Sequence, residues 1–449
     1  MKYKQKVLQA LNSLLKSPLI VNMATVLVIT YSIKLLGFFK ESYIASEFGL
    51  SILIDTYLLA IMIPSLLESV FLSSFSNVFI PNYVKVKRLK VNLESFQTSC
   101  VILTLVISGL LLLISVLSYS IFLETIFPGH DEKYYQLITQ QFYYLIACIP
   151  LWGATSLING MLNVENEYKY SSFTPIFVPI VTIINIYFFQ EELGAIILAF
   201  STFLATALGL IYSLFVATKK KLISLGRPDF KDSYFISMLR QVPYKMSSSM
   251  FTSLIPLVDR YFAAKLIVGS IAAINFGQKI PAFVLGFSLV GLGTVLLPHF
   301  SKLVDTDIKR AYNELFKILN YLFLFSIVLV GLFVIFSEEI IRFLFERNEF
   351  DSNDTAIVTT IQQILLAYVP FYLCGNVMVK FLTSINKNKF MAQMSILNFI
   401  INVVLDYYLF KHFGIYGIVL ATTIIYSINP VVYYIYTKKQ YAIMINKTT

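Results

Sequence analysis

Residues 63–81 read IPSLLESVFLSSFSNVFIP, and residues 280–298 read IPAFVLGFSLVGLGTVLLP. Both stretches open on Ile-Pro and close on Pro after the same interval. A second pair follows in the same order: residues 147–170 read ACIPLWGATSLINGMLNVENEYKY, and residues 367–390 read AYVPFYLCGNVMVKFLTSINKNKF. The first pair is offset by 217 residues and the second by 220. Two landmarks repeated in order predict a duplicated chain of two related halves.

The composition excludes a soluble globular protein. Of the 449 residues, 57% are hydrophobic and only 13% are charged, so too few polar side chains exist to cover a water-facing surface. Apolar runs recur along the chain, and several reach the roughly 20 residues that a helix needs to cross a bilayer. The runs lack the alternation of an outer-membrane barrel, which predicts an all-α polytopic membrane protein.

The apolar runs predict about twelve membrane-spanning helices, six in each half. Because the helix number per half is even, the repeat is parallel, with the halves related by an axis along the membrane normal. Transporters that work by alternating access are often built in this way. The predicted spans are residues 18–39, 52–79, 99–123, 136–162, 171–189, 193–218, 237–264, 267–297, 317–336, 355–382, 390–410 and 414–436.

The charges between these spans predict the topology. Most of the 35 Lys and Arg residues fall in alternate connecting segments, whereas segments such as 338–354 are acidic. Cytoplasmic loops accumulate basic residues, so both termini are expected in the cytoplasm. The predicted divisions are a cytoplasmic amphipathic N-terminus (1–17), an N-lobe (18–218), a cytoplasmic linker (219–236), a C-lobe (237–436) and a cytoplasmic tail (437–449).

Few residues suggest chemistry. The formal charge of +10 is explained by the loop bias, which disfavours nucleic-acid binding. The three cysteines and three histidines are scattered and show no metal-ligand, redox or nucleophile spacing. We therefore expect no enzyme activity, no cofactor and no metal site.

Charged residues inside the predicted spans are the candidate site, because such residues are costly in a membrane and usually functional. Several lysines around one cavity would suit a substrate with phosphate or carboxylate groups. The alternative is that Lys40 and the pair Asp259-Arg260 lie near an interface, where long side chains reach water. Asp406 and Lys380 are interpreted as helix-end residues. The candidates are Lys34, Lys40, Glu41, Asp55, Glu68, Asp259, Arg260 and Lys279.

Several motifs carry a family resemblance. Residues 34–41, KLLGFFKE, followed by Asp55, IPSLL and the tripeptide at 79–81, resemble the first two helices of the MurJ/MviN lipid II flippase family. That family belongs to the multidrug/oligosaccharidyl-lipid/polysaccharide exporter superfamily. Three later stretches are also similar to it: DRYFAA at 259–264, LGTVLLP at 292–298, and FLFERNEF at 343–350 with Asp354-Thr355.

The resemblance implies a V-shaped, two-lobed transporter for an undecaprenyl-diphosphate-linked saccharide. Family arginines that hold the diphosphate fall on Lys34, Lys40 and Lys279, which keep the charge but lose the bidentate fork of Arg. The family's acidic residue between its first two helices falls on Asp55, to which we assign a gating ion pair. A further family arginine falls on Glu68, where the charge is reversed. The family usually has fourteen helices, whereas twelve are predicted here.

These departures leave the glycan open. Lipid II and a surface-polysaccharide repeat unit both fit, which would place the protein in peptidoglycan or polysaccharide biosynthesis at the bacterial cell membrane. A cation-coupled multidrug exporter of the same superfamily is the alternative, and a membrane scaffold for glycan assembly is a third hypothesis. We expect a functional monomer whose partners are the lipid-linked glycan and, secondarily, glycan-assembly enzymes. The energy source is not predicted.

Overall fold

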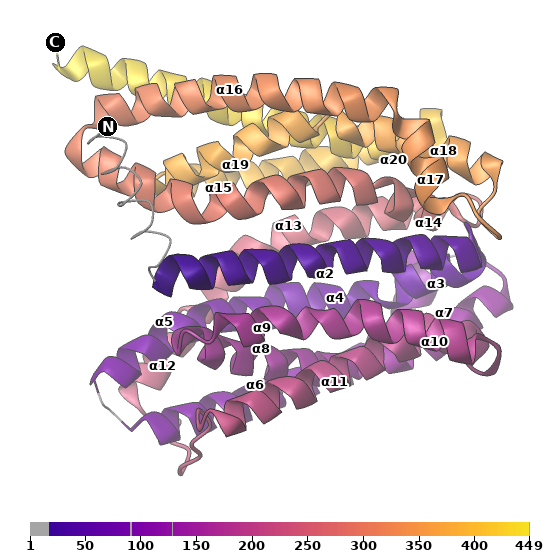
Figure 1. The fold of residues 1–449 in the computed structure, drawn as a ribbon, viewed down its shortest axis with the longest axis horizontal. Helices are drawn as coiled ribbons and strands as arrows, with labels where there is room; N and C mark the ends of the chain where they lie inside the picture. The colour runs from indigo at the N-terminus through magenta and orange to yellow at the C-terminus, as the bar shows by residue number, and fades with distance from the viewer. Residues whose placement is uncertain (1–17, 90–91, 128, 449) are drawn as a thin grey trace, which may run out of the picture. The chain divides into compact units, whose positions relative to one another are not determined.

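The computed structural model describes residues 18–89, 92–127 and 129–448. The predicted N-terminal amphipathic segment, 1–17, lies outside the described residues. Within them the protein is an all-α polytopic membrane protein, and no strand is present. Figure 1 shows the helices.

The first half contains helices up to residue 219, and the second half those from 233 onward. The first set is α2 (Pro18–Phe48), α3 (Ile52–Ala60), α4 (Met62–Leu67), a π-helical turn (Glu68–Leu72), α5 (Ser73–Leu89), α6 (Leu93–Ile126), α7 (Glu132–Ile146), α8 (Cys148–Val164), α9 (Tyr168–Phe173), α10 (Phe177–Leu193) and α11 (Ile197–Lys219). The second set is α12 (Ser233–Leu239), α13 (Val242–Ala263), α14 (Ser270–Gly277), α15 (Lys279–Thr306), α16 (Ile308–Ile335), α17 (Ser337–Phe345), α18 (Ser352–Leu366), α19 (Val369–Ser384) and α20 (Asn388–Thr448).

Seven of the described helical stretches are long and apolar enough to cross a membrane: Ile52–Leu89, Leu93–Leu117, Glu132–Val164, Tyr168–Lys219, Ile308–Ile335, Ser352–Ser384 and Asn388–Ile445. Tyr168–Lys219, of 52 residues, and Asn388–Ile445, of 58, each contain two predicted spans. In both stretches the chain reverses its direction between the two spans. The three remaining predicted spans lie on α2, on α12–α13 and on α14–α15. Each of the twelve predicted spans therefore falls on described helices.

The reversals occur at glycines related by the repeat. Gly194 has φ 47° and ψ −122°, and Gly414 has φ 56° and ψ −129°. A side chain at these angles is strained, whereas glycine reaches them readily. Past the second reversal, a Cβ on Gly417 would lie 2.1 Å from the Leu409 carbonyl oxygen, so the two arms are in close contact. The offset of 220 between Gly194 and Gly414 equals that of the second pair of sequence landmarks.

Replacing Gly194 with alanine should destabilise the protein by about 1–3 kcal/mol, the usual cost of a strained backbone conformation. A Cβ at this position would meet no atom within 4 Å, so the effect would report the backbone alone. Gly331, inside α16, is equally open but has no positive φ. Gly331→Ala should therefore stabilise slightly, by about 0.5–1 kcal/mol. Thermal unfolding in detergent would compare them, and equal shifts would contradict the explanation.

A second backbone feature confirms the repeat. Asn166 and Asn386, also 220 residues apart, are both left-handed, with φ 60° and 56°. The same pattern of backbone hydrogen bonds surrounds each asparagine. In the first half the N–H groups of Glu165, Asn166 and Glu167 donate to the carbonyls of Met161, Asn163 and Leu162, respectively. In the second half those of Ile385, Asn386 and Lys387 donate to the carbonyls of Phe381, Thr383 and Leu382. Asn is one of the few side chains that tolerate this conformation at a helix end.

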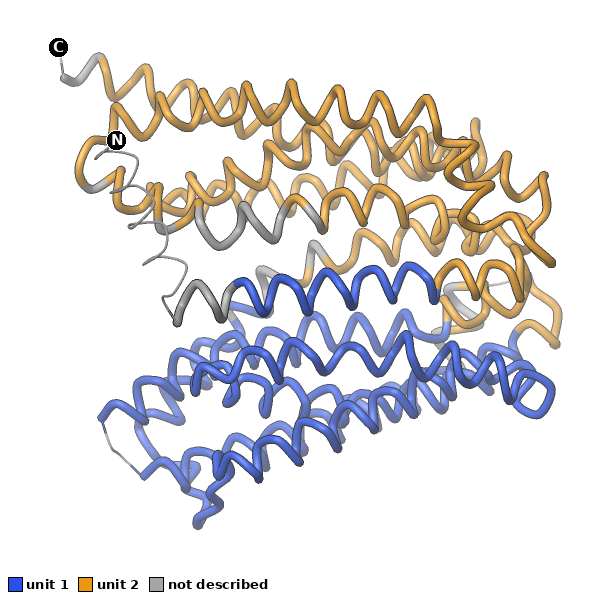
Figure 2. Tube along the Cα trace, viewed as in Figure 1, with its two compact units in different colours: residues 1–40, 60–122, 135–249 blue, residues 41–59, 123–134, 250–449 orange. Residues whose placement is uncertain are grey.

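The chain forms two compact units (Figure 2). Unit 1 contains residues 1–40, 60–122 and 135–249, and unit 2 contains residues 41–59, 123–134 and 250–449. The core of unit 1 joins α5, α6, α8 and α12 through side chains that include Phe79, Phe96, Met161 and Phe235. The core of unit 2 joins α15, α16, α19 and α20 through side chains that include Phe300, Tyr312, Phe381 and Tyr433. The predicted lobes, linker and tail remain predictions.

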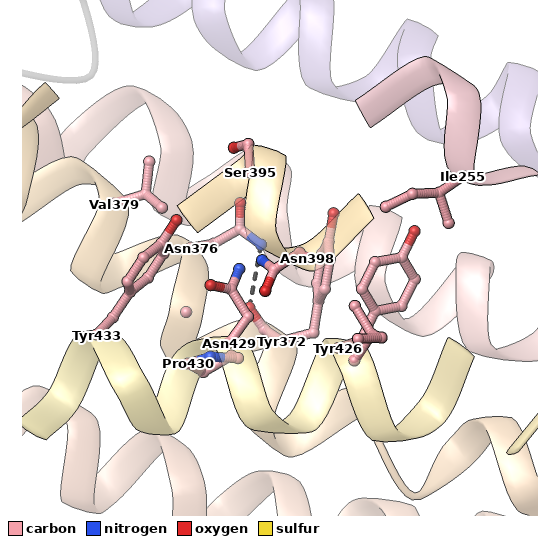
Figure 3. A pocket seen from close by; sticks show the side chains of 12 residues that line it. Ile255, Tyr372, Asn376, Val379, Ser395, Asn398, Tyr426, Asn429, Pro430 and Tyr433 are labelled. Atoms are coloured by element: carbon pink, nitrogen blue, oxygen red, sulfur yellow. Dashed lines mark hydrogen bonds between the residues drawn. The ribbon is translucent and has the colours of Figure 1, made fainter. Parts of the chain in front are cut away.

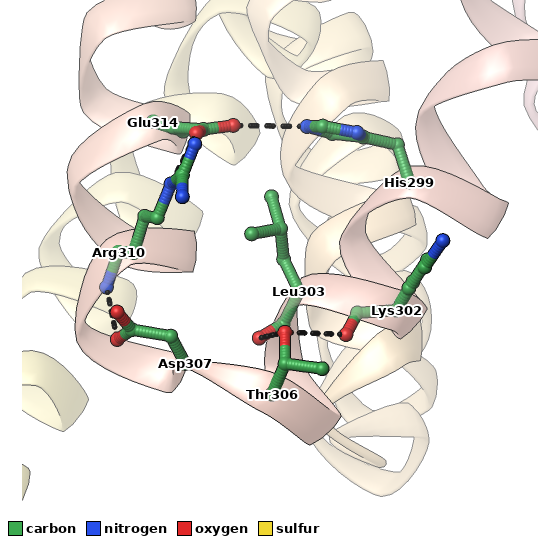
Figure 4. Close-up of polar contacts among 7 residues, drawn as sticks. All are labelled: His299, Lys302, Leu303, Thr306, Asp307, Arg310 and Glu314. Carbon is green, nitrogen blue, oxygen red and sulfur yellow. Dashed lines mark hydrogen bonds and ion pairs between the residues drawn. The ribbon is translucent and has the colours of Figure 1, made fainter.

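The outer side chains of α16 fit lipid contact. Leu324 and Phe325 are each 66% exposed, and Ile335 is 71% exposed. Contiguous apolar exposure of this kind is unfavourable in water and favourable in a bilayer. At the other end of α16, Asp307 caps the helix by accepting from the Arg310 N–H at 2.9 Å (Figure 4). Glu314, on α16, forms a hydrogen bond of 2.9 Å with His299, on α15, and so connects the two helices.

Candidate functional site

Lys279 stands at a break in a membrane helix. α14 ends at Gly277 and α15 begins at Lys279, because Pro281 has no N–H to donate to the Gly277 carbonyl. The same break occurs in the first half, where α3 ends at Ala60 ahead of Pro64. The repeated Ile-Pro motif therefore marks a shared kink. A lysine directly precedes the motif in the second half, whereas Met62 precedes it in the first.

Lys279 forms an ion pair with Glu41. Its Nζ lies 2.9 Å from Glu41 Oε2, and the two side chains are only 23% and 16% exposed. Both residues belong to unit 2. Removing one partner of a shielded pair leaves an uncompensated charge, which is strongly unfavourable. Glu41 therefore balances the charge of Lys279 in this conformation. An anionic ligand could replace Glu41 as the partner of the Lys279 ammonium.

Asp55 holds the start of α14. Its Oδ2 accepts from the Gly269 N–H and its Oδ1 from the Ala272 N–H, both at 2.7 Å. The side chain is 2% exposed. A carboxylate at a helix N-terminus is stabilised by unpaired amides and by the helix dipole. We expected a cation beside Asp55, but its hydrogen-bond partners here are backbone amides.

Asp259 and Arg260 are adjacent in sequence on α13 but have different partners. Asp259 Oδ2 accepts from the Thr422 hydroxyl at 3.0 Å. The Arg260 guanidinium donates to the Leu58 carbonyl at 3.0 Å and interacts electrostatically with Asp259. Both contacts lie within unit 2 and connect α13 with α20 and α3.

A buried carboxylate cluster surrounds Asp259. Asp406 and Asn402 on α20 are both 0% exposed, and Asp406 interacts electrostatically with Asp259. The Asp406 carboxyl group and the Asn402 amide are the polar neighbours of Asp259 in this cluster, and their buried polar atoms find no partner outside it. Our interpretation of Asp406 as a helix-end residue is wrong, because its side chain is fully enclosed.

This cluster has one cation for two carboxyl groups. Burying a second carboxylate without a partner is very costly, so one group must take a proton or share a small cation. The oxygens of Asp259, Asp406, Asn402 and Thr422 are hard donors of the kind that suits such a cation. These four side chains therefore form a candidate site for a proton or a small cation. In the described parts of the chain, no group of three or more His, Cys, Asp or Glu side chains could hold a metal ion.

The other predicted residues lie in unit 1. Lys34 and Lys40 are half-buried on α2, and Glu68 opens the π-helical turn that ends at Leu72. Turns of this type are rare and often occur at functional sites. The described parts of unit 1 show no ion pair between Glu68 and Lys34. The predicted set thus divides between Lys34, Lys40 and Glu68 in unit 1 and Glu41, Asp55, Asp259, Arg260 and Lys279 in unit 2.

A family model for the lipid II flippase MurJ matches residues 44–449. The chain belongs to the MurJ family. A probable lipid II flippase MurJ from Synechocystis sp. is 26% identical over 417 residues, covering 87% of this chain and 76% of the relative. Another, from Buchnera aphidicola subsp. Schizaphis graminum, is 25% identical over 416 residues, covering 90% and 80%.

Solved structures show the same fold. A lipid II flippase MurJ in an inward closed conformation aligns with a TM-score of 0.79 and 22% identity, covering 92% of this chain and 87% of that one. An inward-facing multidrug resistance transporter of the MATE family aligns with a TM-score of 0.77 and 10% identity, covering 94% and 100%. The MurJ resemblance of the sequence motifs is confirmed, and the MATE likeness extends to the fold alone.

Proposed function

We propose that this MurJ family member is a flippase that moves an undecaprenyl-diphosphate-linked saccharide from the inner to the outer leaflet of the bacterial cell membrane by alternating access. Membership in a family of lipid II flippases supports the substrate class. The basic bias of alternate loops supports a cytoplasmic location of both termini. The process is transport and needs no catalytic residue.

The observation that carries this proposal is the shielded Lys279–Glu41 pair at the helix break. A diphosphate would replace Glu41 as the partner of Lys279, so the ammonium would remain compensated when substrate binds and when it leaves. A charged hydrogen bond is lost only as another forms, which keeps the barrier to exchange low. Lys34 and Lys40 are proposed as further diphosphate ligands. Glu68 is proposed as a negative charge that weakens their attraction for the anion.

Ion coupling is proposed for the carboxylate cluster. Binding a proton or small cation at Asp259 and Asp406 would remove the unpaired buried charge and tighten the packing of α13 against α20. A ligand that favours one arrangement shifts the conformational equilibrium by its difference in affinity. Transport would then follow the gradient of that ion, with the monomer as the functional unit and glycan-assembly enzymes as partners.

The alternative is a cation-coupled multidrug exporter. It is favoured by the carboxylate cluster and by the MATE-like fold, but the family match and the intramembrane lysines favour an anionic substrate. Drug resistance on overexpression that survives Lys279→Ala would support the exporter.

Complementation tests the flippase proposal. The chain would be expressed in a bacterium depleted of its lipid II flippase, with membrane abundance measured in parallel. Rescue of growth would establish lipid II as a substrate. If the well-expressed wild type fails while Glu68→Arg rescues, the reversed charge at position 68 excludes lipid II. Failure of both would exclude lipid II as the glycan and direct the test to surface-polysaccharide precursors.

A further inference from the structure

Unit 2 contains a polar pocket that none of the predicted site residues lines. The cavity, of about 360 Å³, lies among α13, α19 and α20 (Figure 3). This volume falls within the range of about 300–1,000 Å³ typical of small-molecule pockets. None of its lining residues is charged. Its polar groups are the Ser395 hydroxyl, the three carboxamides of Asn376, Asn398 and Asn429, and the three phenols of Tyr372, Tyr426 and Tyr433. We call it the amide pocket after the carboxamides.

The amides of this pocket are incompletely satisfied. Asn429 Oδ1 is buried and has no hydrogen-bond partner, although the Asn429 side chain contacts the Tyr433 hydroxyl. Asn398, on α20, is 8% exposed and makes no hydrogen bond to the described residues. Asn376 donates only to the carbonyl of Tyr372, one turn earlier in its own helix, at 3.0 Å. Buried amides normally find partners, so these groups have capacity for a ligand.

The repeat supplies an internal comparison. The positions 220 residues earlier than Asn376, Asn398 and Asn429 hold Ser156, Val178 and Gly209. The fold that both halves share therefore does not require the amides.

In the first half, polar side chains near the equivalent position bond to one another. Ser213, which corresponds to Tyr433, donates to Asn159 Oδ1 at 3.2 Å and is 3.2 Å from the Thr174 hydroxyl. These polar groups satisfy one another. The Thr155 hydroxyl, which corresponds to Gly375 of the amide pocket, is buried without a hydrogen-bond partner, so the first half keeps one open group in this region. The open carboxamides themselves belong to the second half.

The pocket wall is rigid beside Asn376. A Cβ on Gly375 would lie 2.8 Å from Pro430 Cγ, so α19 and α20 approach as closely as they can there. Pro430 also lines a separate apolar cavity of about 230 Å³, which includes Asn320 of α16. A fixed wall keeps the amides at set spacings, which is what selective recognition needs.

The geometry points to the amide pocket as a binding subsite for the neutral saccharide of the lipid-linked substrate; this rests on the proposed function. Sugar hydroxyl and acetamido groups donate and accept hydrogen bonds, as carboxamides and phenols do. A diphosphate would be buried there without a cation, and a prenyl chain would leave the amides unpaired, both at high cost. A stem peptide carries ionised groups that the uncharged lining cannot compensate.

The test is a binding comparison with the full chain in lipid nanodiscs. Two probes are used: undecaprenyl diphosphate alone, and undecaprenyl diphosphate carrying a disaccharide without peptide. Asn398→Leu and Asn429→Leu keep the side-chain branching but remove the amide. Each should weaken binding of the glycosylated probe about tenfold, the effect of one lost hydrogen bond to a buried group, and leave the bare probe unchanged. Asn320→Leu, across Pro430, is the matched control and should change neither affinity.

The outcomes separate the subsite from the flippase proposal. Equal weakening of both probes, or equal affinity of the wild type for both, would overturn the subsite while the flippase stands. A loss seen only with a peptide-bearing probe would assign the pocket to the peptide instead. Failure of the wild type to bind either probe would instead count against the proposed function. If a leucine variant does not fold, Asn398→Ser, which is smaller and retains one hydroxyl, should give a partial loss for the glycosylated probe alone.

Discussion

Lys279→Ala should abolish transport, by at least about 100-fold, in cells where the wild type is active. The substitution removes the shielded ammonium proposed to bind the diphosphate and leaves Glu41 without its partner. A charge-assisted hydrogen bond to phosphate contributes about 1.5–3 kcal/mol, and the unpaired Glu41 carboxylate would further repel the anion. Flipping of a fluorescent lipid-linked saccharide in proteoliposomes would measure the loss. Lys279→Arg should retain transport, because Arg also pairs with carboxylates and phosphates.

A double variant separates charge pairing from transport. Lys279→Ala alone should also lower thermal stability, because Glu41 becomes an unpaired charge in a shielded place. Adding Glu41→Gln should restore stability but not transport. Lys411→Ala, on an exposed lysine of the same unit, is the control and should leave both unchanged. Transport by the Lys279→Ala/Glu41→Gln variant would contradict a direct role for Lys279 in substrate binding.

The sequence predicted the parts of the fold that local chemistry dictates. Ile63-Pro64 and Ile280-Pro281 predicted the repeat, and the structure shows why they recur: each proline ends the helix before it. Asn166 and Asn386 aligned in the sequence, and both are left-handed helix ends. Charge-free runs identified the spans because a bilayer imposes length and composition directly.

The candidate site was less accessible from sequence, because its contacts join residues far apart in the chain. Asp406 precedes Tyr407, Tyr408 and Lys411, a composition typical of a helix end, and only the packing of α13 against α20 buries it with Asp259. The signal available was its spacing of four from Asn402, which places both polar side chains on one helical face. The amides of the pocket lie on two helices at spacings that no motif captures.

Asp406→Asn should abolish transport while leaving thermal stability equal or higher. Two buried carboxyl groups near a single arginine are unfavourable for the fold, so a neutral amide at position 406 relieves repulsion with Asp259. The same change removes the group that would take up a proton or small cation, and with it the response to a gradient. Lost function combined with retained stability is the pattern expected when a protein tolerates an unfavourable group for its activity. Asp351→Asn, on the exposed cap of α18, is the control for carboxylate loss. Asn also caps helices well, so this change should lower stability only slightly, through the lost charge at the helix N-terminus, and should not affect transport.

Melting temperatures across pH and monovalent cation concentration would identify what the cluster binds. In the wild type, a bound cation should raise the melting temperature with its concentration, because a ligand of the folded state stabilises that state. A proton should instead raise it as the pH falls, since neutralising one carboxyl group removes the unpaired buried charge. Asp406→Asn should flatten whichever dependence is present. If the variant transports normally, or keeps the full dependence, the cluster is structural and the driving ion acts at another charged residue of the spans.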